Sequence, residues 1–447
     1  MAEQYDLIVI GGGPGGIAAA AAAADKKRVL ILEREGWGGT CANRGCIPTK
    51  ALLTCSKAFA DMKKFKRLGI NTSGTSIDFT AIKKHQQQAV KIAALGAHKA
   101  LTDAQVEMKF GTGELISPQE VRYTDDKGNT ILLSAKHIII AWGSQPLLLP
   151  RINLSERILT SDGLLNTENI PQSIIIVGAS VIGIEFATFF AELGSAVTLI
   201  ELLDRVLPFE DQEAAQLLHQ ELARLGVDIH TSTKLESLND TGKNVTAKAR
   251  ISDKQFEKNA DYALLCTGRQ PLLYEEELKR LGIEYTNTGI KIDKNMMTNV
   301  NGVYAVGDVT GGLMLAHRAT MQGKVAARHI CGFDSYVYNE NLIPSVVYGH
   351  PQIARIGIIQ QDADVQIIKS DYSTNAVARM ELENKGFVKA FFRNDKLTGA
   401  TICGNNAADL ISPLTLAISN GMTKKQLRQW VIPHPALSEI FGALIGD

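Results

Sequence analysis

The stretch YDLIVIGGGPGGIAAAAAAAD, residues 5–25, determines the fold expected for the first part of this 447-residue chain. It is typical of a buried strand, a glycine turn and a helix whose alanines allow close packing against a sheet. A second apolar run, VLILE at residues 29–33, completes a strand–helix–strand unit of the kind found in parallel sheets. The sequence therefore predicts a parallel α/β sheet at the N-terminal end.

Gly11, Gly13 and Gly16 have the spacing of a dinucleotide-binding turn. The first glycine permits a tight turn, the second lets a pyrophosphate approach the backbone, and the third lets helix and strand touch. The helix that follows offers its free N–H groups and positive dipole end to the phosphates. Glu33 ends the next strand, where it can accept hydrogen bonds from the adenosine ribose. These residues predict a first dinucleotide site.

The same pattern returns after the strand SIIIV at residues 173–177. Gly178 and Gly183 hold the outer glycine positions, whereas Ser180 replaces the middle glycine; its hydroxyl could either bond the phosphate or weaken binding. Glu201 ends the next strand, and a carboxylate there favours the free 2′-hydroxyl of NAD over the 2′-phosphate of NADP. The next two residues, Leu202 and Leu203, are apolar, so neither supplies the arginine that would bind that phosphate. A second site, specific for NAD, is expected.

Composition excludes several classes of protein. Hydrophobic residues make up 45% of the chain, and 47 basic residues balance 47 acidic ones, so no global field attracts nucleic acid or an anionic membrane. No apolar run approaches the roughly 20 residues needed to cross a bilayer. Glu3 and Asp6 occupy the place of the basic region of a secretion signal. We expect a soluble, cytoplasmic, multidomain protein without nucleic-acid or membrane partners.

The segment GTCANRGCIPTK, residues 39–50, brings Cys41 and Cys46 close together in a chain with six cysteines. A zinc site would need two more ligands at suitable spacing, and a plant-type iron–sulfur cluster would need its next cysteine earlier than Cys55. We therefore expect no metal site. A purely structural disulfide is unexpected in a reducing compartment, which favours a disulfide that opens and closes.

Geometry constrains this cysteine pair. In a regular helix, residues five apart have Cα atoms about 8 to 9 Å apart, beyond the roughly 7 Å limit for a disulfide. The helix must therefore be distorted between the cysteines, and Gly45 can tolerate that distortion.

GGTCANRGCIPTK, with GGGPGG before it and AVGD at residues 305–308 after it, resembles the pyridine nucleotide-disulfide oxidoreductases; HPALSE at residues 434–439 is similar to the C-terminal catalytic motif of that family. The resemblance covers essentially the whole chain and is strongest to the dihydrolipoyl dehydrogenases. It implies an α/β fold with two Rossmann-like dinucleotide-binding domains and a C-terminal α+β interface (dimerisation) domain. The expected segments are 1–148 for FAD binding, 149–270 for NAD binding, 271–341 returning to the FAD domain, and 342–447 for the interface.

The resemblance also implies roles near the flavin. Cys41 would exchange with the substrate dithiol, and Cys46 would lie against the flavin as the charge-transfer thiolate. Lys50 would lie near flavin N5 and pair with Glu185. Cofactor contacts would include Asp308, at the ribityl chain, and Gly143.

At the other end of the chain, the resemblance makes His434 a base that is oriented by Glu439 and reaches the cysteine pair of the partner subunit of a homodimer. The His434–Pro435 peptide would be cis. A base is useful because a thiol with a pKa of about 8.5 is only a few per cent thiolate at neutral pH. His317 and His350 are expected to be structural.

The expected function is oxidation of dihydrolipoamide, free or on a lipoyl domain, through the cysteine pair and FAD to NAD, within a 2-oxoacid dehydrogenase or glycine-cleavage complex. Three features depart from the family: Trp142 replaces a threonine, Ile432 and Pro433 precede the catalytic histidine, and the segment after Gly357 looks short. Alternatives are a reductase for a small disulfide or mercuric ion, although the C-terminal GALIGD lacks a vicinal cysteine pair, or an FAD-binding assembly subunit without turnover.

Overall fold

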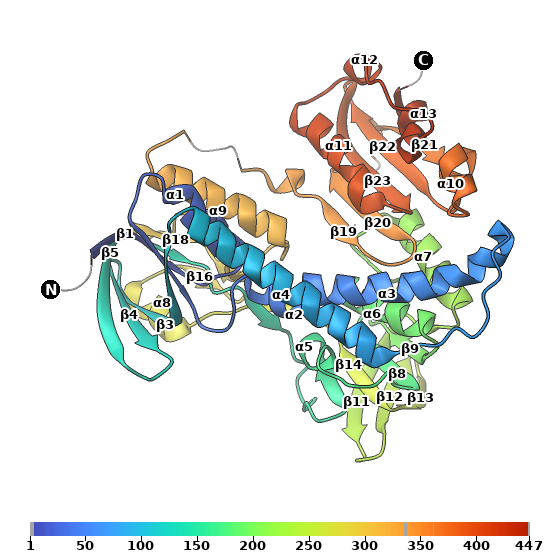
Figure 1. The fold of residues 1–447 in the computed structure, drawn as a ribbon, viewed down its shortest axis with the longest axis horizontal. Helices are drawn as coiled ribbons and strands as arrows, with labels where there is room; N and C mark the ends of the chain where they lie inside the picture. Colours follow the sequence, from blue (N-terminus) through green and yellow to red (C-terminus); the bar gives the residue numbers. More distant parts are fainter. Residues whose placement is uncertain (1–3, 335–337, 361, 446–447) are drawn as a thin grey trace. The chain divides into compact units, whose positions relative to one another are not determined.

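The computed structural model describes residues 4–334, 338–360 and 362–445. The chain forms two compact units (Figure 1). The first unit comprises residues 1–51, 83–147 and 268–339, and the second comprises residues 52–82, 148–267 and 340–447. Each unit is thus assembled from three stretches that are distant in sequence.

A parallel sheet forms the centre of the first unit. Its strands, in spatial order, are β3 (Glu107–Ser117), β2 (Val29–Glu33), β1 (Gln4–Ile10), β5 (Thr130–Ile140) and β18 (Val303–Ala305). β4 (Glu120–Asp125) pairs antiparallel with both β3 and β5. Leu7, Ile8 and Val9 are fully buried, as expected for a parallel strand covered on both faces.

The alanine run forms α1 (Pro14–Ala23), which lies beside α9 (Ala316–Ile330) (Figure 1). Small residues make this approach close enough for backbone contact. A Cβ atom added to Gly323 would lie only 2.3 Å from the carbonyl oxygen of Gly15. The alanine- and glycine-rich composition is therefore explained by helix–helix and helix–sheet packing.

The first unit also contains α2 (Gly39–Arg44), α8 (Glu275–Leu281), β16 (Tyr285–Thr286), β17 (Gly289–Ile290) and η2 (Gly307–Thr310). The residues of α3 (Cys46–Phe65) and α4 (Phe79–Asp103) are divided between the two units, and η1 (Lys66–Leu68) belongs to the second. A two-stranded ribbon of β6 (Ser144–Pro146) and β15 (Arg269–Pro271) lies where the chain leaves the first unit and returns to it.

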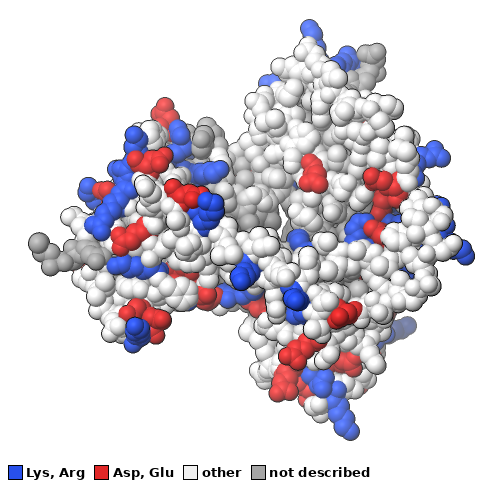
Figure 2. Space-filling view, viewed as in Figure 1, with Lys and Arg blue, Asp and Glu red and all other residues white. Residues whose placement is uncertain are grey.

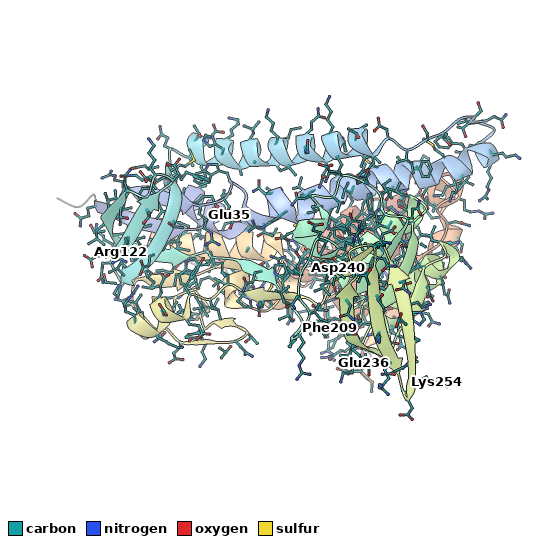
Figure 3. All side chains as sticks on the ribbon, turned by 90° about the horizontal axis from the view of Figure 1, so that it is seen from below. Glu35, Arg122, Phe209, Glu236, Asp240 and Lys254 are labelled. Carbon is teal, nitrogen blue, oxygen red and sulfur yellow. The ribbon has the colours of Figure 1, made fainter. Side chains whose placement is uncertain are left out.

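The second unit contains another parallel sheet, in the order β10 (Asp228–His230), β9 (Ala196–Ile200), β8 (Ser173–Val177), β14 (Tyr262–Leu265) and β7 (Ile158–Thr160). The helices of this part are α5 (Ser161–Leu164), α6 (Val181–Glu192) and α7 (Gln212–Arg224). An antiparallel sheet of β11 (Thr233–Asp240), β12 (Val245–Ile251) and β13 (Lys254–Ala260) follows, and Figure 3 shows Lys254 at the turn between β12 and β13.

The C-terminal part is an antiparallel sheet in the order β19 (Ser345–Val347), β20 (Gln352–Gly357), β23 (Lys396–Gly404), β22 (Phe387–Arg393) and β21 (Gln366–Asp371). Its helices are η3 (Glu340–Leu342), η4 (Tyr372–Thr374), α10 (Ala376–Met380), α11 (Ala407–Ser419), α12 (Lys424–Leu427), η5 (Leu437–Phe441) and α13 (Gly442–Ile445). The predicted fold class, two Rossmann-like α/β parts and a C-terminal α+β part, is confirmed.

The structure differs from the expected segments at residues 52–82, which belong to the second unit. The reason is packing: Leu52 and Leu53 are buried in the same hydrophobic cluster as Phe186 and Phe190 of α6. The division of the second unit into separate NAD-binding and interface domains stays a prediction. None of the described helices has the length and apolar character required to cross a membrane.

Candidate active site and dinucleotide turns

In the first glycine turn, neighbouring backbone leaves no room for a side chain at two glycines, whereas the third faces open space. Gly11 has φ +118°, and a Cβ there would lie 2.2 Å from the carbonyl oxygen of Ala141. A Cβ on Gly16 would lie 2.0 Å from the carbonyl oxygen of Gly11. Gly13 is different, because its backbone is extended and a Cβ there would meet nothing within 4 Å. The open space at Gly13, before the N-terminus of α1, fits a pyrophosphate.

The Glu33 carboxylate stabilises the backbone of the first turn by accepting hydrogen bonds from its N–H groups. Its Oε2 accepts the N–H of Gly12 at 2.6 Å, and its Oε1 accepts the N–H of Glu35 at 2.7 Å; Glu35 is labelled in Figure 3. The sequence had assigned Glu33 only to a ribose. Oε1 also accepts the N–H of Gly36 at 3.1 Å. A carboxylate has about four acceptor positions, so these three bonds leave capacity for a ribose hydroxyl.

The second turn repeats this construction. A Cβ on Gly178 would lie 2.4 Å from the carbonyl oxygen of Cys266, and a Cβ on Gly183 would lie 1.9 Å from that of Gly178. The Glu201 carboxylate accepts the N–H of Ala179 at 2.6 Å and the N–H of Leu203 at 2.8 Å. The two carboxylates therefore support their turns in the same way.

Ser180 fits the second turn without backbone strain. Its φ and ψ of −71° and 179° nearly equal the −76° and 179° of Gly13, so the position does not require glycine. The Ser180 hydroxyl donates to the carbonyl oxygen of Cys266 at 2.9 Å and is therefore turned into the protein. Arg205, the first cation after Glu201 in the sequence, donates to the carbonyl oxygens of Pro208 and Glu210.

The cysteine pair lies on a broken helix. α2 ends at Arg44, and α3 begins at Cys46; between them Gly45 has φ −135° and ψ −109°. A Cβ on Gly45 would lie 3.0 Å from the carbonyl oxygen of Thr40. The distortion predicted from the spacing is therefore confirmed, and glycine is favoured at the break.

The structure holds Cys41 and Cys46 as thiols. The hydrogen bond to Cys46 raises the pKa of Cys41, burial adds to the increase, and the positive charge of Lys50 opposes it. The carboxylate of Asp308 also raises the Cys41 pKa, which places it among the charges that act on the thiol.

Asp308 is held by two residues that the sequence did not single out. The Ser144 hydroxyl donates to Asp308 Oδ2 at 2.6 Å, and Arg269 donates through Nε to Ser144 Oγ and through Nη2 to Ser144 O, both at 2.9 Å. Because Ser144 has one hydroxyl proton, these contacts fix its direction toward Asp308. The sequence feature that could have identified Ser144 and Arg269 is their position close to the two points where the chain passes from one unit to the other.

His434 and Glu439 form the expected pair in the C-terminal part. The distance from His434 Nδ1 to Glu439 Oε1 is 2.8 Å, and the N–H of Ala436 donates to Glu439 Oε2 at 2.8 Å. The bond from Ala436 and the bond to His434 lower the pKa of Glu439 below its ordinary value. The predicted cis peptide between His434 and Pro435 is confirmed. The His434 side chain is 77% exposed, so it can meet a second molecule.

Other predicted residues have structural contacts. Glu185 is buried in α6 and accepts the N–H of Tyr348 at 3.2 Å; its pairing with Lys50 stays a prediction. His350 Nδ1 lies 2.5 Å from Glu192, which also accepts the hydroxyl of Ser56 at 2.6 Å. This buried network agrees with a structural role for His350.

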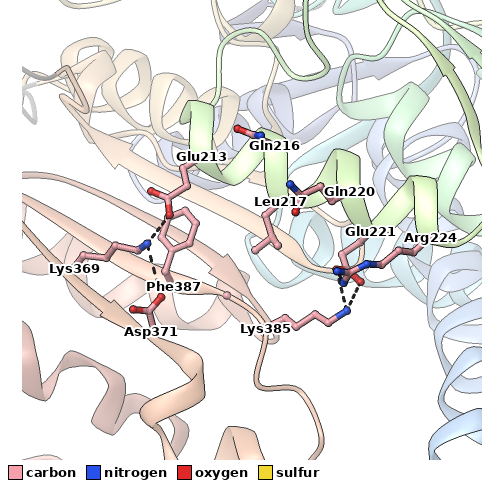
Figure 4. A pocket seen from close by; sticks show the side chains of 11 residues that line it. Glu213, Gln216, Leu217, Gln220, Glu221, Arg224, Lys369, Asp371, Lys385 and Phe387 are labelled. Carbon is pink, nitrogen blue, oxygen red and sulfur yellow. Dashed lines mark hydrogen bonds and ion pairs between the residues drawn. The ribbon is translucent and has the colours of Figure 1, made fainter.

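A groove of about 400 Å³ lies between α7 and the β21–β22 edge (Figure 4). Its charges are paired within the protein: Lys369 with Glu213 at 2.5 Å, and Lys385 with Glu221 at 2.7 Å. None of the predicted site residues lines it. Figure 2 likewise shows basic and acidic side chains mixed on the visible face. Within the described residues, no group of three or more His, Cys, Asp or Glu could hold a metal ion.

Two dinucleotide turns, a cysteine pair and a histidine–glutamate pair together define a nucleotide-dependent dithiol–disulfide oxidoreductase. The family described as pyridine nucleotide-disulphide oxidoreductase matches residues 5–323, and its dimerisation domain matches residues 343–445. The chain belongs to this family.

Relatives and solved structures agree. The chain is 35% identical over 421 residues to a dihydrolipoyl dehydrogenase of Bacillus subtilis (strain 168), covering 92% of this chain and 91% of the relative. It is 34% identical to a dihydrolipoyl dehydrogenase of Chlamydia pneumoniae, covering 100% and 97%. The structure is similar to LpdA from Mycobacterium tuberculosis, with a TM-score of 0.92, 28% identity and coverage of 99% and 98%. It is also similar to the HOCl-induced flavoprotein disulfide reductase RclA from Escherichia coli, with a TM-score of 0.85, 25% identity and coverage of 98% and 99%.

The predicted family and enzyme class are therefore confirmed: the chain is an NAD-dependent flavoprotein oxidoreductase, and its family binds FAD and NAD(H). The first turn fits FAD in its open space at Gly13 and in the free N-terminus of α1. The dimerisation domain supports a homodimer.

Proposed function

We propose that this protein oxidises dihydrolipoamide with NAD, using Cys41 and Cys46 as its redox pair. The observation that carries the proposal is the Cys41–Cys46 hydrogen bond across the helix break at Gly45. A hydrogen bond between the two side chains supports a pair that closes and opens reversibly. The relatives named dihydrolipoyl dehydrogenase support the choice of substrate.

In the proposed reaction the pair starts as a disulfide. A substrate thiolate attacks Cys41 and forms a mixed disulfide, and Cys46 leaves as a thiolate. The second substrate thiol then displaces Cys41, so the substrate becomes a disulfide while the cysteine pair gains two electrons. FAD, when bound, would supply the electron relay between the cysteine pair and NAD.

His434 accepts the protons of the substrate thiols in this proposal. An exposed imidazole on the dimerisation domain can serve the cysteine pair of a partner subunit, which makes the homodimer necessary for activity. Glu439 orients the ring through Nδ1, which leaves Nε2 for the proton transfer. A positioned base contributes about 10² to 10⁴ in rate.

In this proposal, the remaining site residues bind the two cofactors. Gly11, Gly13, Gly16 and Glu33 hold the adenosine half of FAD, with Gly143 and Asp308 toward the flavin and Lys50, paired with Glu185, near flavin N5. The second turn, Gly178, Ser180, Gly183 and Glu201, holds NAD.

A second candidate is reduction of another small disulfide. The similarity to the flavoprotein disulfide reductase RclA and the replacement residues Ile432 and Pro433 beside His434 favour it. Under the main proposal the dimer works in the cytoplasm with a 2-oxoacid dehydrogenase or glycine-cleavage complex.

Steady-state assays of the purified dimer test these alternatives. One assay follows reduction of NAD by dihydrolipoamide, and the other follows reduction of other small disulfides by NADH. The main proposal predicts that kcat/KM is at least tenfold higher in the first assay. Turnover with another disulfide alone would select the second candidate. A yellow protein without turnover in either direction would indicate an assembly subunit.

A further inference from the structure

Asn43 lies on α2 between the two cysteines, two residues after the first and three before the second. Its side chain is half-buried, and Asn43 Nδ2 donates to the carbonyl oxygen of Gly39 at 2.9 Å. It also donates to the carbonyl oxygens of Gly36 and Trp37, at 3.2 Å each. An amide has two N–H donors, so both are used and two of the oxygens share one proton.

The loop that Asn43 binds, residues 36–39, connects the first dinucleotide turn to the cysteine helix. The N–H of Gly38 donates to the carbonyl oxygen of Gly12 at 2.9 Å. Three of the four loop residues are glycines, and Gly38 and Gly39 have φ of +91° and +57°. Glycine loses more conformational freedom on folding than any other residue, so such a loop depends on contacts from outside to keep one shape. The Asn43 amide supplies three of these contacts.

α2 is too short to hold the first cysteine in place by itself. It has six residues, and isolated helices shorter than about 12 residues are marginal in water. Its N-cap, Gly38, has no side chain to cap the helix, and the helix is broken at Gly45. The orientation of α2 therefore depends on its side chains. Asn43 binds the loop, and the neighbouring Arg44 forms an ion pair with Glu35.

We propose that Asn43 is a positioning residue that holds Cys41 in place for bonding to Cys46 and thereby sets the dithiol–disulfide equilibrium of the pair. A disulfide accepts only a narrow range of separations and directions of its two residues, and strain makes it easier to reduce. A fixed α2 gives the two thiols a high effective concentration for closure. Freeing α2 lowers that concentration, so the disulfide becomes less stable relative to the dithiol. The proposal rests on the proposed function, because it requires these two cysteines to be the redox pair.

Equilibration of the FAD-loaded dimer with lipoamide and dihydrolipoamide tests the proposal. The two cysteine thiols pass two electrons and two protons to lipoamide, which becomes dihydrolipoamide. Alkylation, followed by mass measurement of the peptide that carries both cysteines, gives the ratio of dithiol to disulfide. Asn43→Ala should shift the equilibrium constant about tenfold toward the dithiol, which corresponds to about 30 mV. Asn43→Asp keeps the size of the side chain but turns a carboxylate toward three carbonyl oxygens, so it should shift the constant further.

Asn299→Ala is the matched control, because Asn299 also binds backbone groups in the first unit. It donates to the carbonyl oxygen of Gly282 and accepts the N–H of Glu284, both at 2.8 Å. None of these residues belongs to the site, so Asn299→Ala should change the equilibrium constant by less than about twofold.

Hydrogen exchange of the wild type supplies a readout that needs no variant. The amides of Gly38 and Ala42, which bond to the carbonyl oxygens of Gly12 and Gly38, should exchange at least about tenfold more slowly than those of the exposed segment 71–76. Exchange as fast as in that segment would overturn the proposal. So would a folded, FAD-bearing Asn43→Ala whose equilibrium constant lies within about twofold of the wild-type value. A wild type whose two cysteines keep one oxidation state at every ratio of lipoamide to dihydrolipoamide would instead overturn the proposed function.

Discussion

Under the proposed function, the preference for NAD over NADP depends on Glu201, and Glu201→Gln tests this role. Glutamine keeps the size of the side chain and one carbonyl oxygen, but its NH₂ group cannot accept a hydrogen bond. One of the two bonds from backbone N–H groups, at 2.6 and 2.8 Å in the structure, is therefore lost. The carboxylate charge that repels a 2′-phosphate is lost as well.

The magnitudes of these two effects can be separated. A unit negative charge about 5 Å from a carboxylate, at an effective dielectric constant of about 20, costs about 3 kcal/mol. This cost corresponds to roughly 10² in affinity, so the preference for NAD over NADP should fall by about 10² in Glu201→Gln. The lost backbone bond weakens the turn by about 1.5 to 3 kcal/mol for both coenzymes, so it cancels from the ratio.

The assay is kcat/KM for NAD and for NADP with the same dithiol. Glu33→Gln is the matched control, because Glu33 supports the first turn through equivalent bonds at 2.6 and 2.7 Å. Glu33→Gln should release FAD faster and leave the coenzyme ratio unchanged. A ratio in Glu201→Gln within about twofold of the wild-type value would refute the electrostatic argument, because repulsion of about 3 kcal/mol would then be absent.

Three further predictions follow, two for the histidine–glutamate pair and one for the hydrogen bond that holds Asp308. His434→Gln should slow substrate oxidation by about 10² to 10⁴ while electron transfer from flavin to NAD, followed by stopped-flow absorbance, changes little; equal losses in both steps would contradict its role as base. The pKa of Glu439 is lowered below 4.5, so its carboxylate keeps its hydrogen bonds at pH 4.5 and above and loses them only as the pH falls through the lowered pKa. The pH–rate profile should therefore show no ionisation of Glu439 between pH 5 and 9. An added acid limb in that range that Glu439→Gln removes would contradict the assignment. Ser144→Ala removes a 2.6 Å hydrogen bond to Asp308 and should accelerate FAD release by about tenfold or more. Ser144→Thr keeps a hydroxyl donor and should retain FAD as the wild type does. Equal retention of FAD by the two variants would show that the hydrogen bond does not position Asp308.

Local patterns predicted much of this structure. The turn around Gly11, the helix break at Gly45 and the contact between His434 and Glu439 all depend on residues close in sequence, whose geometry follows from backbone sterics and side-chain reach. The repeat of strand, turn and helix predicted the second sheet for the same reason.

Contacts between distant segments were not predictable. The Ser180 hydroxyl is directed by a carbonyl 86 positions away, and Ser144 is held by Arg269 at a separation of 125. Only the folded chain brings such groups together. The assignment of residues 52–82 to the second unit depends likewise on apolar packing against α6, which no local pattern encodes.

Anaerobic reduction of the FAD-loaded dimer by one equivalent of dihydrolipoamide tests the redox pair most directly. The wild type should take up two electrons on its sulfurs and develop a long-wavelength absorption band from the Cys46 thiolate against oxidised flavin, whereas Cys46→Ser should show no such band. A band that persists in Cys46→Ser, or a wild type in which the first two electrons bleach the flavin, would contradict the account.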